Sequence, residues 1–257
     1  MLHQMMRWKQ PAWRALTPEG RAAMANEAAS ALTAMGAEQS AVFSMLGHKG
    51  DLLFVHFRRD LDGLNRAELA LSRLPIWDYL EPTTSYVSVV ELGLYESTAR
   101  IYKTFSERGL EPGTDAWDAA LAEEMARQRK AMEPRLHPAM PAHRYACFYP
   151  MDRRRGEEKN WYMVPFADRA RMMHEHGMVG RKYQGIVRQI ISGSVGLDDW
   201  EWGVTLFSED PLQFKKLIYE MRFDEVSAVY AGFGQFYVGL RVKNEDLPRL
   251  LAEGELA

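Results

Sequence analysis

The chain carries the same order of strands and helices twice, and this repeat limits its fold more than any single motif does. In the first half, β-rich runs and helical apolar patterns follow one another as strand, helix, strand, strand, helix, strand. The second half shows the same order, although the two halves share little sequence. Two βαββαβ units in one chain predict an α+β protein with two ferredoxin-like domains, the arrangement of the dimeric α+β barrel superfold.

The first ferredoxin-like domain is predicted over residues 1–96. Its first helix begins at Pro18, with Thr17 as the N-cap, and its second helix is expected over residues 60–74. Its strands are expected at residues 1–6, 40–46, 52–57 and 86–94.

A connector is predicted over residues 97–141, where the pattern changes. Residues 98–108 are mixed and polar, and residues 115–132 form a charged amphipathic helix. The helix is followed by three prolines, Pro134, Pro138 and Pro141. A structureless loop of this length would be unusual in a compact domain, so the connector has a helix of its own.

The second ferredoxin-like domain is predicted over residues 142–257. One helix is expected over residues 165–176, with Gly177 as the residue that ends it, and another over residues 210–221, capped by Asp210. Strands are expected at residues 145–149, 161–164, 186–195, 200–207, 226–230 and 236–242.

The composition excludes several classes of function. A net charge of −3 provides no global basic field for a nucleic acid, and no run of about 18 apolar residues is present to form a membrane span. The start of the chain lacks the apolar segment and cleavage site of a secretory signal. The single cysteine, Cys147, excludes a disulfide framework, favours the cytoplasm and is best explained as a small buried hydrophobic residue.

His176 is a candidate metal ligand. It continues the apolar face of its helix three residues after Met173, whereas His174 points away. A neutral imidazole on that face can bind iron or zinc; the alternative is a core histidine with a satisfied hydrogen bond. No HExxH or CxxC motif accompanies it, so a closed zinc site is not expected, and a single ligand suits a metal already held by a macrocycle. Its own hydrogen-bond partner is expected among Asp198, Asp199 and Glu225.

Tyr149 and Gln189 are further candidates, each with a structural alternative. Tyr149 ends a predicted strand just before Pro150, where a phenol can donate a hydrogen bond or be oxidised to a radical. The alternative is an ordinary tyrosine of a strand. Gln189 lies on a strand face between Val187 and Ile191, where an amide either meets a ligand or needs a buried partner.

A run of arginines at residues 153–155 lies between Arg135 and Lys159. Arginine binds carboxylate or phosphate through two parallel hydrogen bonds, so the run indicates a site for an acidic ligand, with a solvated loop as the alternative. Ser227 and Arg222 flank the last helix-to-strand connection and can reach the same cavity. A flat apolar wall, or else ordinary core packing, is expected from Met172, Met173, Trp200 and Trp202.

Beyond these single residues, long segments of the chain are similar to a known family. The segments YPMDRRRGEEKNWYMVP and HGMVGRKYQGIVRQIISGSVGLDDWEWGVTLF closely resemble the coproheme decarboxylases, the HemQ branch of the chlorite dismutase-like family. The resemblance is nearly ungapped from about Arg135 to Tyr237. It is thinner but continuous in the first half, where YVSVVELGLYE is also similar, and the connector looks longer than usual.

The resemblance implies a role for each matching residue. His176 matches the proximal ligand of the haem iron, Tyr149 the catalytic tyrosine whose radical takes hydrogen from a propionate, and Gln189 the distal-side glutamine. The residues that it implies as contacts of the porphyrin and its propionates are Arg135, Tyr149, Pro150, Met151, Asp152, Arg153, Gln189 and Ser227. At residue 153 the family usually has lysine, so the rate or order of the two decarboxylations is expected to differ here.

The implied activity is the hydrogen peroxide-dependent oxidative decarboxylation of two propionates of iron coproporphyrin III to vinyl groups, which gives haem b. The resemblance also implies a cytoplasmic homopentamer with transient contact to the upstream ferrochelatase. Two alternatives stay open. A chlorite dismutase would carry a distal arginine where this chain has Gln189, although Arg181 and Arg188 are close in sequence. A haem-binding or haem-transfer protein would keep His176 without needing Tyr149.

Overall fold

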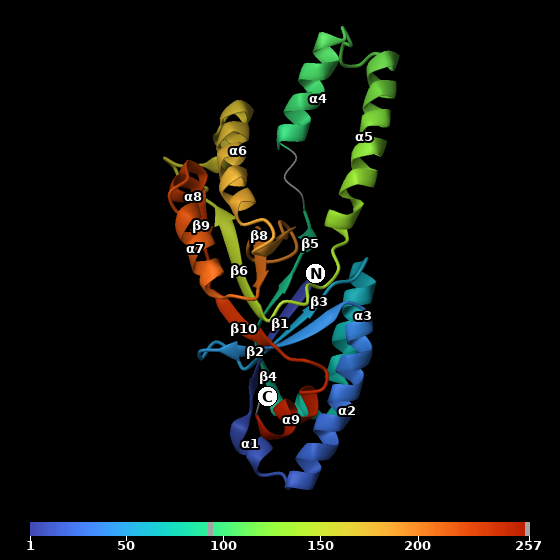
Figure 1. The fold of residues 1–257 in the computed structure, drawn as a ribbon, viewed down its shortest axis with the longest axis vertical. Coiled ribbons are helices and arrows are strands. Elements are labelled where there is room, and N and C mark those ends of the chain that lie inside the picture. The colour runs from blue at the N-terminus through green and yellow to red at the C-terminus, as the bar shows by residue number, and fades with distance from the viewer. Residues whose placement is uncertain (92–94, 255–257) are drawn as a thin grey trace.

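The computed structural model describes residues 1–91 and 95–254, and Figure 1 labels its elements. The strands are β1 (Leu2–Trp8), β2 (Ser40–Leu46), β3 (Leu52–His56), β4 (Leu80–Val87), β5 (Val89–Val90), β6 (Tyr145–Arg153), β7 (Arg188–Gly193), β8 (Trp202–Ser208), β9 (Ala231–Phe233) and β10 (Tyr237–Arg241). The longer helices are α2 (Pro18–Ala37), α3 (Leu61–Ser72), α4 (Tyr95–Glu107), α5 (Asp115–Leu136), α6 (Phe166–Lys182) and α7 (Leu212–Met221). The shorter ones are α1 (Gln10–Arg14), α8 (Glu225–Tyr230), α9 (Leu247–Glu253) and the 3-10 helices η1 (Pro75–Tyr79) and η2 (Trp161–Met163).

The described strands form one sheet in the order β4-β1-β3-β2-β10-β6-β8-β7-β5, with β9 paired to β6. Within each half, the last long strand lies beside the first one: β4 pairs with β1, and β10 pairs with β6. Antiparallel pairing of β10 with β2 joins the two halves, with Arg241 opposite Phe43. The repeat in the sequence is therefore also a repeat in strand order.

The sheet curves so that its two ends approach each other. β4 and β5 lie at opposite ends of the strand order, yet only Ser88 separates them along the chain. The hydroxyl groups of Tyr86 and Ser194 form a hydrogen bond, and the backbone N–H of Val87 donates to Asp198 over 2.9 Å. Apolar side chains from both halves fill the inside of the curve, including Met5, Phe43, Leu53, Val55, Tyr86, Phe148, Ile190, Phe207 and Tyr237.

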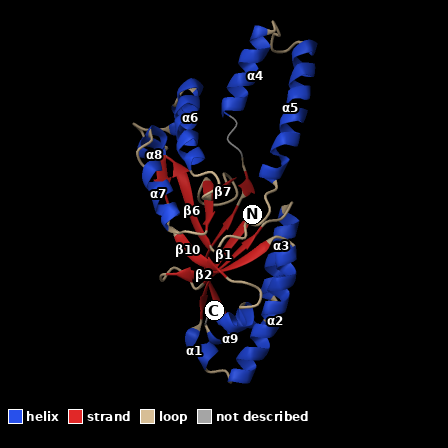
Figure 2. Cartoon of the chain, viewed as in Figure 1, coloured by secondary structure: helices blue, strands red, loops and turns tan. Residues whose placement is uncertain are grey.

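Helices cover the outer faces of the sheet (Figure 2). α2 and α9 pack over the first half around a core that includes Leu32 and Leu247. α6 and α7 pack over the second half, where Leu206 and Leu217 are buried. The hairpin of α4 and α5 extends away from the sheet in Figure 1 and has a small core of its own. No helix of the described chain is both long and apolar enough to cross a bilayer.

Several helix caps and strand bounds agree with the sequence-based expectations. β2 spans Ser40–Leu46 as predicted. The Thr17 hydroxyl accepts a hydrogen bond from the backbone N–H of Gly20 over 3.1 Å, at the start of α2. The Asp210 carboxylate accepts one from the N–H of Leu212 over 3.0 Å, at the start of α7. These side chains satisfy N–H groups that have no partner within the helix, so local sequence is enough to predict them.

Two segments predicted as strands are helical. Residues 161–164 begin with η2, where the Asn160 side chain accepts a hydrogen bond from the Tyr162 N–H over 3.0 Å. Residues 226–230 belong to α8, where the Asp224 carboxylate accepts one from the Ser227 N–H over 2.8 Å. In both cases a cap immediately before the helix satisfies a backbone donor and outweighs the β propensity of the residues that follow.

The helix predicted to end at His176 continues through Gly177 to Lys182. At Gly180, an added Cβ would lie 3.4 Å from Cε of Met221 and 3.6 Å from Nε2 of Gln189. These are ordinary contacts, and the glycine lies inside the helix rather than at its end. The chain turns only after the helix, at Gly185, whose φ is +83°.

The end of the first half and the connector also differ from the prediction. The strand expected at residues 86–94 begins earlier, since β4 starts at Leu80, and it is interrupted at Ser88. Residues 92–94 lie outside the described chain. The connector holds two helices, because the polar residues 95–107 form α4, and α5 continues through Pro134 in its last turn. α4 is stabilised by packing against its neighbours, a tertiary effect that a local pattern does not reveal.

Candidate functional site

A cavity of about 440 Å³ lies in the second half, between the outer face of β6, β7 and β8 and the helices α6, α7 and α8. The end of α5 also contributes to its wall. Of the residues predicted for the site, those that line this cavity are Arg135, Tyr149, Met151, Arg153, Met173, His176, Gln189, Trp202 and Ser227, whereas Met172, Trp200 and Arg222 do not line it. Chain segments far apart in sequence thus converge on one volume, which has the size of pockets for small molecules and cofactors.

The alternation of β6 explains which of its residues reach the cavity. Successive side chains of a strand point to opposite faces, so Tyr149, Met151 and Arg153 share the cavity side. Pro150 and Asp152, which the resemblance also implied as porphyrin contacts, do not line the cavity. The carboxylate of Asp152 instead accepts a hydrogen bond from the backbone N–H of Glu201 over 2.8 Å.

His176 lines the cavity and is oriented by a carboxylate. Its Nδ1 lies 2.9 Å from Oδ2 of Asp224, a side chain that is 5% exposed, and 3.4 Å from the Ser227 hydroxyl. Burial opposes ionisation of Asp224, but the hydrogen bonds from His176 and Ser227 outweigh it and lower the pKa of the carboxyl group. Asp224 is therefore ionised and holds the Nδ1 side of the ring, which leaves Nε2 as the nitrogen able to bind a ligand. His174 is exposed and lies outside the cavity lining.

Asp224 was not among the partners expected for His176. Of those, Asp198 accepts the N–H of Val87, and Glu225 forms an ion pair with Arg171 over 2.9 Å. The sequence signal for Asp224 is its position as a helix N-cap, with the polar Ser227 three positions later. Because a strand was predicted over residues 226–230, no helix start was expected at Asp224. One carboxylate thus both caps α8 and orients the histidine.

Tyr149 is almost fully buried, with 4% of its surface exposed. Its ring stacks on Phe236, with 4.5 Å between ring centres, and lies 5.9 Å from the ring of Phe233. Burial is the main reason why the pKa of Tyr149 is raised above its ordinary value. The phenol is consequently protonated at neutral pH and keeps an O–H bond at the cavity wall.

Arg153 is also buried, with 8% exposed. Its guanidinium lies 5.0 Å from the ring centre of Trp161 and 6.0 Å from that of Trp202, within the range of cation–π attraction. Its backbone N–H donates to Oε2 of Glu201 over 2.8 Å. Trp161, Trp202 and Met173 all line the cavity, so the arginine is held beside apolar surface. Glu201 and Trp161 were not predicted, because only the fold brings them next to residue 153.

Gln189 lines the cavity from β7, and its Nε2 donates to the carbonyl of Gly180 over 3.3 Å. Arg188 also lines the cavity, whereas Arg181 does not. Glu91 is a further lining residue that was not predicted, and its carboxylate accepts a hydrogen bond from Nε1 of Trp202 over 3.3 Å. Within the described chain, no three His, Cys, Asp or Glu residues cluster to hold a metal ion. A metal in this cavity would thus need most of its ligands from another source.

Fold and site together define an α+β protein with one large cavity that combines a single oriented histidine, a buried phenol and several arginines. A family model described as chlorite dismutase matches residues 21–242. The structure is similar to that of a haem-binding protein from Thermus thermophilus, with 41% identity, a TM-score of 0.78 and coverage of 97% of this chain and 93% of that one. A chlorite dismutase from Candidatus Nitrospira defluvii, 16% identical, has the same fold, with a TM-score of 0.72 over 98% of this chain and 94% of that one. The chain belongs to the chlorite dismutase family.

Proposed function

We propose that this protein is a coproheme decarboxylase, which uses hydrogen peroxide to convert two propionates of iron coproporphyrin III into the vinyl groups of haem b. The observation that carries the proposal is the meeting of Tyr149, His176 and Gln189 at one cavity. Together they provide a metal ligand, an oxidisable phenol and a neutral amide. The neutral amide at residue 189 favours this reaction over chlorite dismutation, for which a cation at that position would hold the oxyanion; Arg188, which also lines the cavity, is exposed.

The cavity fits an iron porphyrin that arrives with its metal already held. His176 would bind the iron through Nε2, because Asp224 occupies Nδ1. Arg135 and Arg153 bring positive charge to the same cavity, and Ser227 brings a hydroxyl group, so these residues would bind the propionates. The similarity to a haem-binding protein supports a ligand of this class.

Each decarboxylation is a two-electron oxidation: R–CH₂–CH₂–COO⁻ + H₂O₂ + H⁺ gives R–CH=CH₂ + CO₂ + 2 H₂O. Hydrogen peroxide is the two-electron oxidant, and the bound iron coproporphyrin III, which is both substrate and redox centre, would pass its oxidising equivalents to Tyr149 and the propionate. Tyr149 gives up the hydrogen atom of its phenol, and the resulting tyrosyl radical takes a hydrogen atom from the propionate. The propionate radical then loses CO₂ and one electron, which the second oxidising equivalent of the peroxide takes up, and the vinyl group remains. The raised pKa of Tyr149 supports this role, because the hydrogen atom must be present at the start.

The same proposal includes the organisation of the chain and its assembly. Residues 1–96 and 142–257 would be two ferredoxin-like domains, and residues 97–141 the connector between them. The supporting observation is the strand order, in which each half places its last long strand beside its first. We also propose that the protein is a cytoplasmic homopentamer that receives its substrate from a ferrochelatase, and this part of the proposal rests on the family resemblance.

The test is to titrate hydrogen peroxide into the complex with iron coproporphyrin III and to follow the porphyrins by mass spectrometry. We expect two successive products, each lacking CO₂ and two hydrogen atoms relative to the species before it, and we expect Tyr149→Phe to bind the substrate without converting it. Conversion by Tyr149→Phe at the wild-type rate would show that the assigned mechanism is wrong. Tight binding without conversion by the wild-type protein would instead favour a haem-binding or haem-transfer protein.

A further inference from the structure

Glu201 is a buried carboxylate that the proposed reaction does not use. It lies directly before β8, and its side chain is only 7% exposed. A buried charge is unfavourable unless hydrogen bonds or an ion pair compensate for the loss of water. The partners of Glu201 therefore indicate its role.

The backbone ladder between β6 and β8 ends next to this carboxylate, with Met151 opposite Trp202 as its last pair. The next two N–H groups are bonded to side chains instead. The N–H of Arg153 donates to Oε2 of Glu201, and the N–H of Glu201 donates to Oδ1 of Asp152, each over 2.8 Å. Two carboxylates thus continue the connection between the strands beyond the end of the ladder, and they satisfy both backbone donors.

Two further partners reach Glu201 from the segment that follows β6. Nε of Arg155 lies 3.6 Å from Oε1 of Glu201. The phenol of Tyr162, in η2, donates a hydrogen bond to the same carboxylate. Burial and this hydrogen bond raise the pKa of Tyr162, so the phenol keeps the proton that it donates. Glu201 therefore joins the end of β6, the loop that follows it and η2 to the start of β8.

These contacts place Arg153, which lines the porphyrin cavity. Its guanidinium lies 5.0 Å from the ring centre of Trp161 and 6.0 Å from that of Trp202. Trp161 directly precedes Tyr162 in sequence, and the second ring directly follows Glu201. Both rings thus belong to segments that Glu201 joins, and a shift of these segments would move the guanidinium together with the surfaces on which it stacks.

We propose that Glu201 is a positioning residue for Arg153, which it holds at the cavity by fixing the backbone N–H of that residue and the loop that follows. This role depends on the proposed function, in which Arg153 binds a propionate of iron coproporphyrin III. Glu201 does not line the cavity, so it acts through Arg153 rather than on the ligand.

Hydrogen–deuterium exchange of the full chain tests the contact without any porphyrin. We expect the amide of Arg153, followed in peptides that span residues 150–156, to exchange at least about tenfold faster in Glu201→Ala than in the wild type, because its acceptor is removed. Glu201→Gln should keep most of the protection, since its amide oxygen can still accept this hydrogen bond. Unchanged protection in folded Glu201→Ala would overturn the proposal.

A double-mutant cycle tests whether Glu201 acts through Arg153. The affinity for iron coproporphyrin III, measured by Soret titration without peroxide, should fall about tenfold in Glu201→Ala. In an Arg153→Gln background the same change should have an effect of no more than about twofold, because the side chain that it misplaces is already absent. A purely structural role would lower the affinity by the same factor in both backgrounds, and that result would overturn the proposal.

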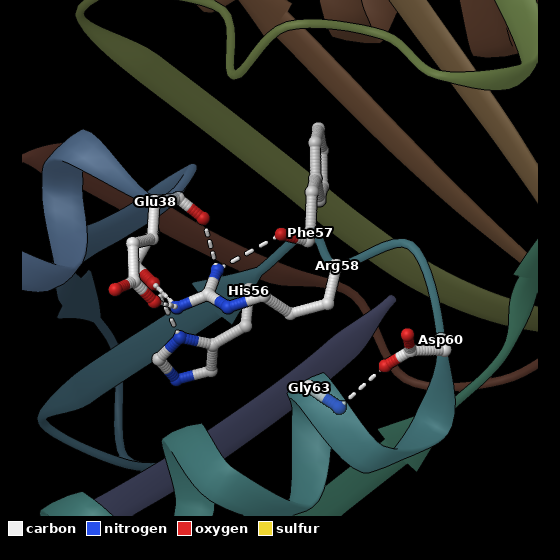
Figure 3. Close-up of polar contacts among 7 residues, drawn as sticks. Glu38, His56, Phe57, Arg58, Asp60 and Gly63 are labelled. Carbon is white, nitrogen blue, oxygen red and sulfur yellow. Dashed lines mark hydrogen bonds and ion pairs between the residues drawn. The ribbon is translucent and has the colours of Figure 1, made fainter.

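Glu38→Gln is the matched control. Figure 3 shows Glu38 beside Arg58 in the first half of the molecule, and their charged groups are 3.6 Å apart, as are those of Glu201 and Arg155. Glu38→Gln should bind iron coproporphyrin III as the wild type does, whereas Glu201→Gln should bind it a few-fold more weakly. Equal affinities of these two variants would contradict the positioning role.

Two outcomes outside this scheme are also informative. If Glu201→Ala does not fold, Glu201→Gln carries the same cycle, and its loss of affinity should likewise disappear in the Arg153→Gln background; a loss that persists there in full would overturn the proposal. If the wild-type protein does not bind iron coproporphyrin III, the proposed function fails, while the exchange measurement still decides whether Glu201 holds the backbone of Arg153.

Discussion

The Nδ1 atom of His176 lies 2.9 Å from Oδ2 of Asp224, and this contact joins the middle of α6 to the residue that caps α8. The second oxygen of the same carboxylate accepts the backbone N–H of Ser227 over 2.8 Å. The position of the proposed iron ligand is thereby coupled to a short helix that carries another residue of the cavity wall. The Asp224 side chain therefore both caps α8 and orients His176.

Replacing Asp224 with asparagine tests this coupling. Asparagine caps a helix as well as aspartate does, so α8 should stay folded while the charge at Nδ1 is lost. We expect affinity for iron coproporphyrin III to fall by about 10- to 100-fold, as is typical when a partner of a metal-binding histidine is removed. Titration followed by the Soret band measures it. Glu225→Gln, next in sequence but paired with Arg171, is the control; equal losses in both variants would contradict an orienting role for Asp224.

The stacking of Arg153 makes a second prediction. Arg153→Lys keeps the charge but loses the planar group that lies over Trp161, a contact of about 1 kcal/mol. We expect the affinity for iron coproporphyrin III to fall several-fold. We also expect a larger share of singly decarboxylated porphyrin, measured by mass spectrometry during peroxide titration. Arg154→Lys changes an exposed neighbour and should leave the product ratio unaltered. A wild-type ratio in Arg153→Lys would show that residue 153 does not act on the second step.

Gly203 lies on the inside of the curved sheet, where we expect an added side chain to clash. An added Cβ there would lie 2.5 Å from Cε1 of Tyr86 and 3.1 Å from Cε2 of Phe148, both of them buried ring atoms. Gly203→Ala should therefore lower the free energy of unfolding by about 1–3 kcal/mol, measured by urea denaturation. Gly232→Ala, whose Cβ would have only ordinary contacts at 3.8 Å and beyond, is the control. Equal stability of the two variants would mean that Tyr86 and Phe148 can move aside freely.

Two buried histidines predict a loss of stability in acid. Burial lowers the pKa of His3 and of His56 to about 3, whereas the unfolded chain has the ordinary value of about 6.5. Between these values the unfolded state binds more protons, so the free energy of unfolding decreases as the pH falls from about 6.5 toward 3. Each histidine contributes at most about 1.4 kcal/mol per pH unit.

Urea denaturation between pH 7 and 5 measures this effect, and His3→Phe separates it from the titration of carboxyl groups. The substitution places an apolar ring where the histidine stacks on Phe148, with 4.1 Å between ring centres. We expect a shallower decline of stability with pH in this variant, whereas the exposed His48→Gln should follow the wild type. An unchanged slope in His3→Phe would indicate that His3 titrates normally in the folded state.

The parts of the fold that local rules govern could be predicted from the sequence. The α+β class follows from the periodicity of apolar residues, and the caps at Thr17 and Asp210 follow from the need to satisfy helix N–H groups. The position of His176 at the cavity and the exposure of His174 follow from helical phase. Residues 226–230 were assigned incorrectly because their β propensity is a weak preference, and the cap at Asp224 overrides it.

The sequence by itself thus determined the α+β class, most of the long helices and strands, the family resemblance and the residue types available for the site. Only the tertiary structure decided that Asp224, rather than Asp198 or Glu225, holds His176, and that Arg153 lies against Trp161. Local patterns specify which face of an element a side chain occupies. The residue that contacts this side chain comes from a distant segment of the chain. Its position depends on how the whole sheet curves and on how the helices pack on it.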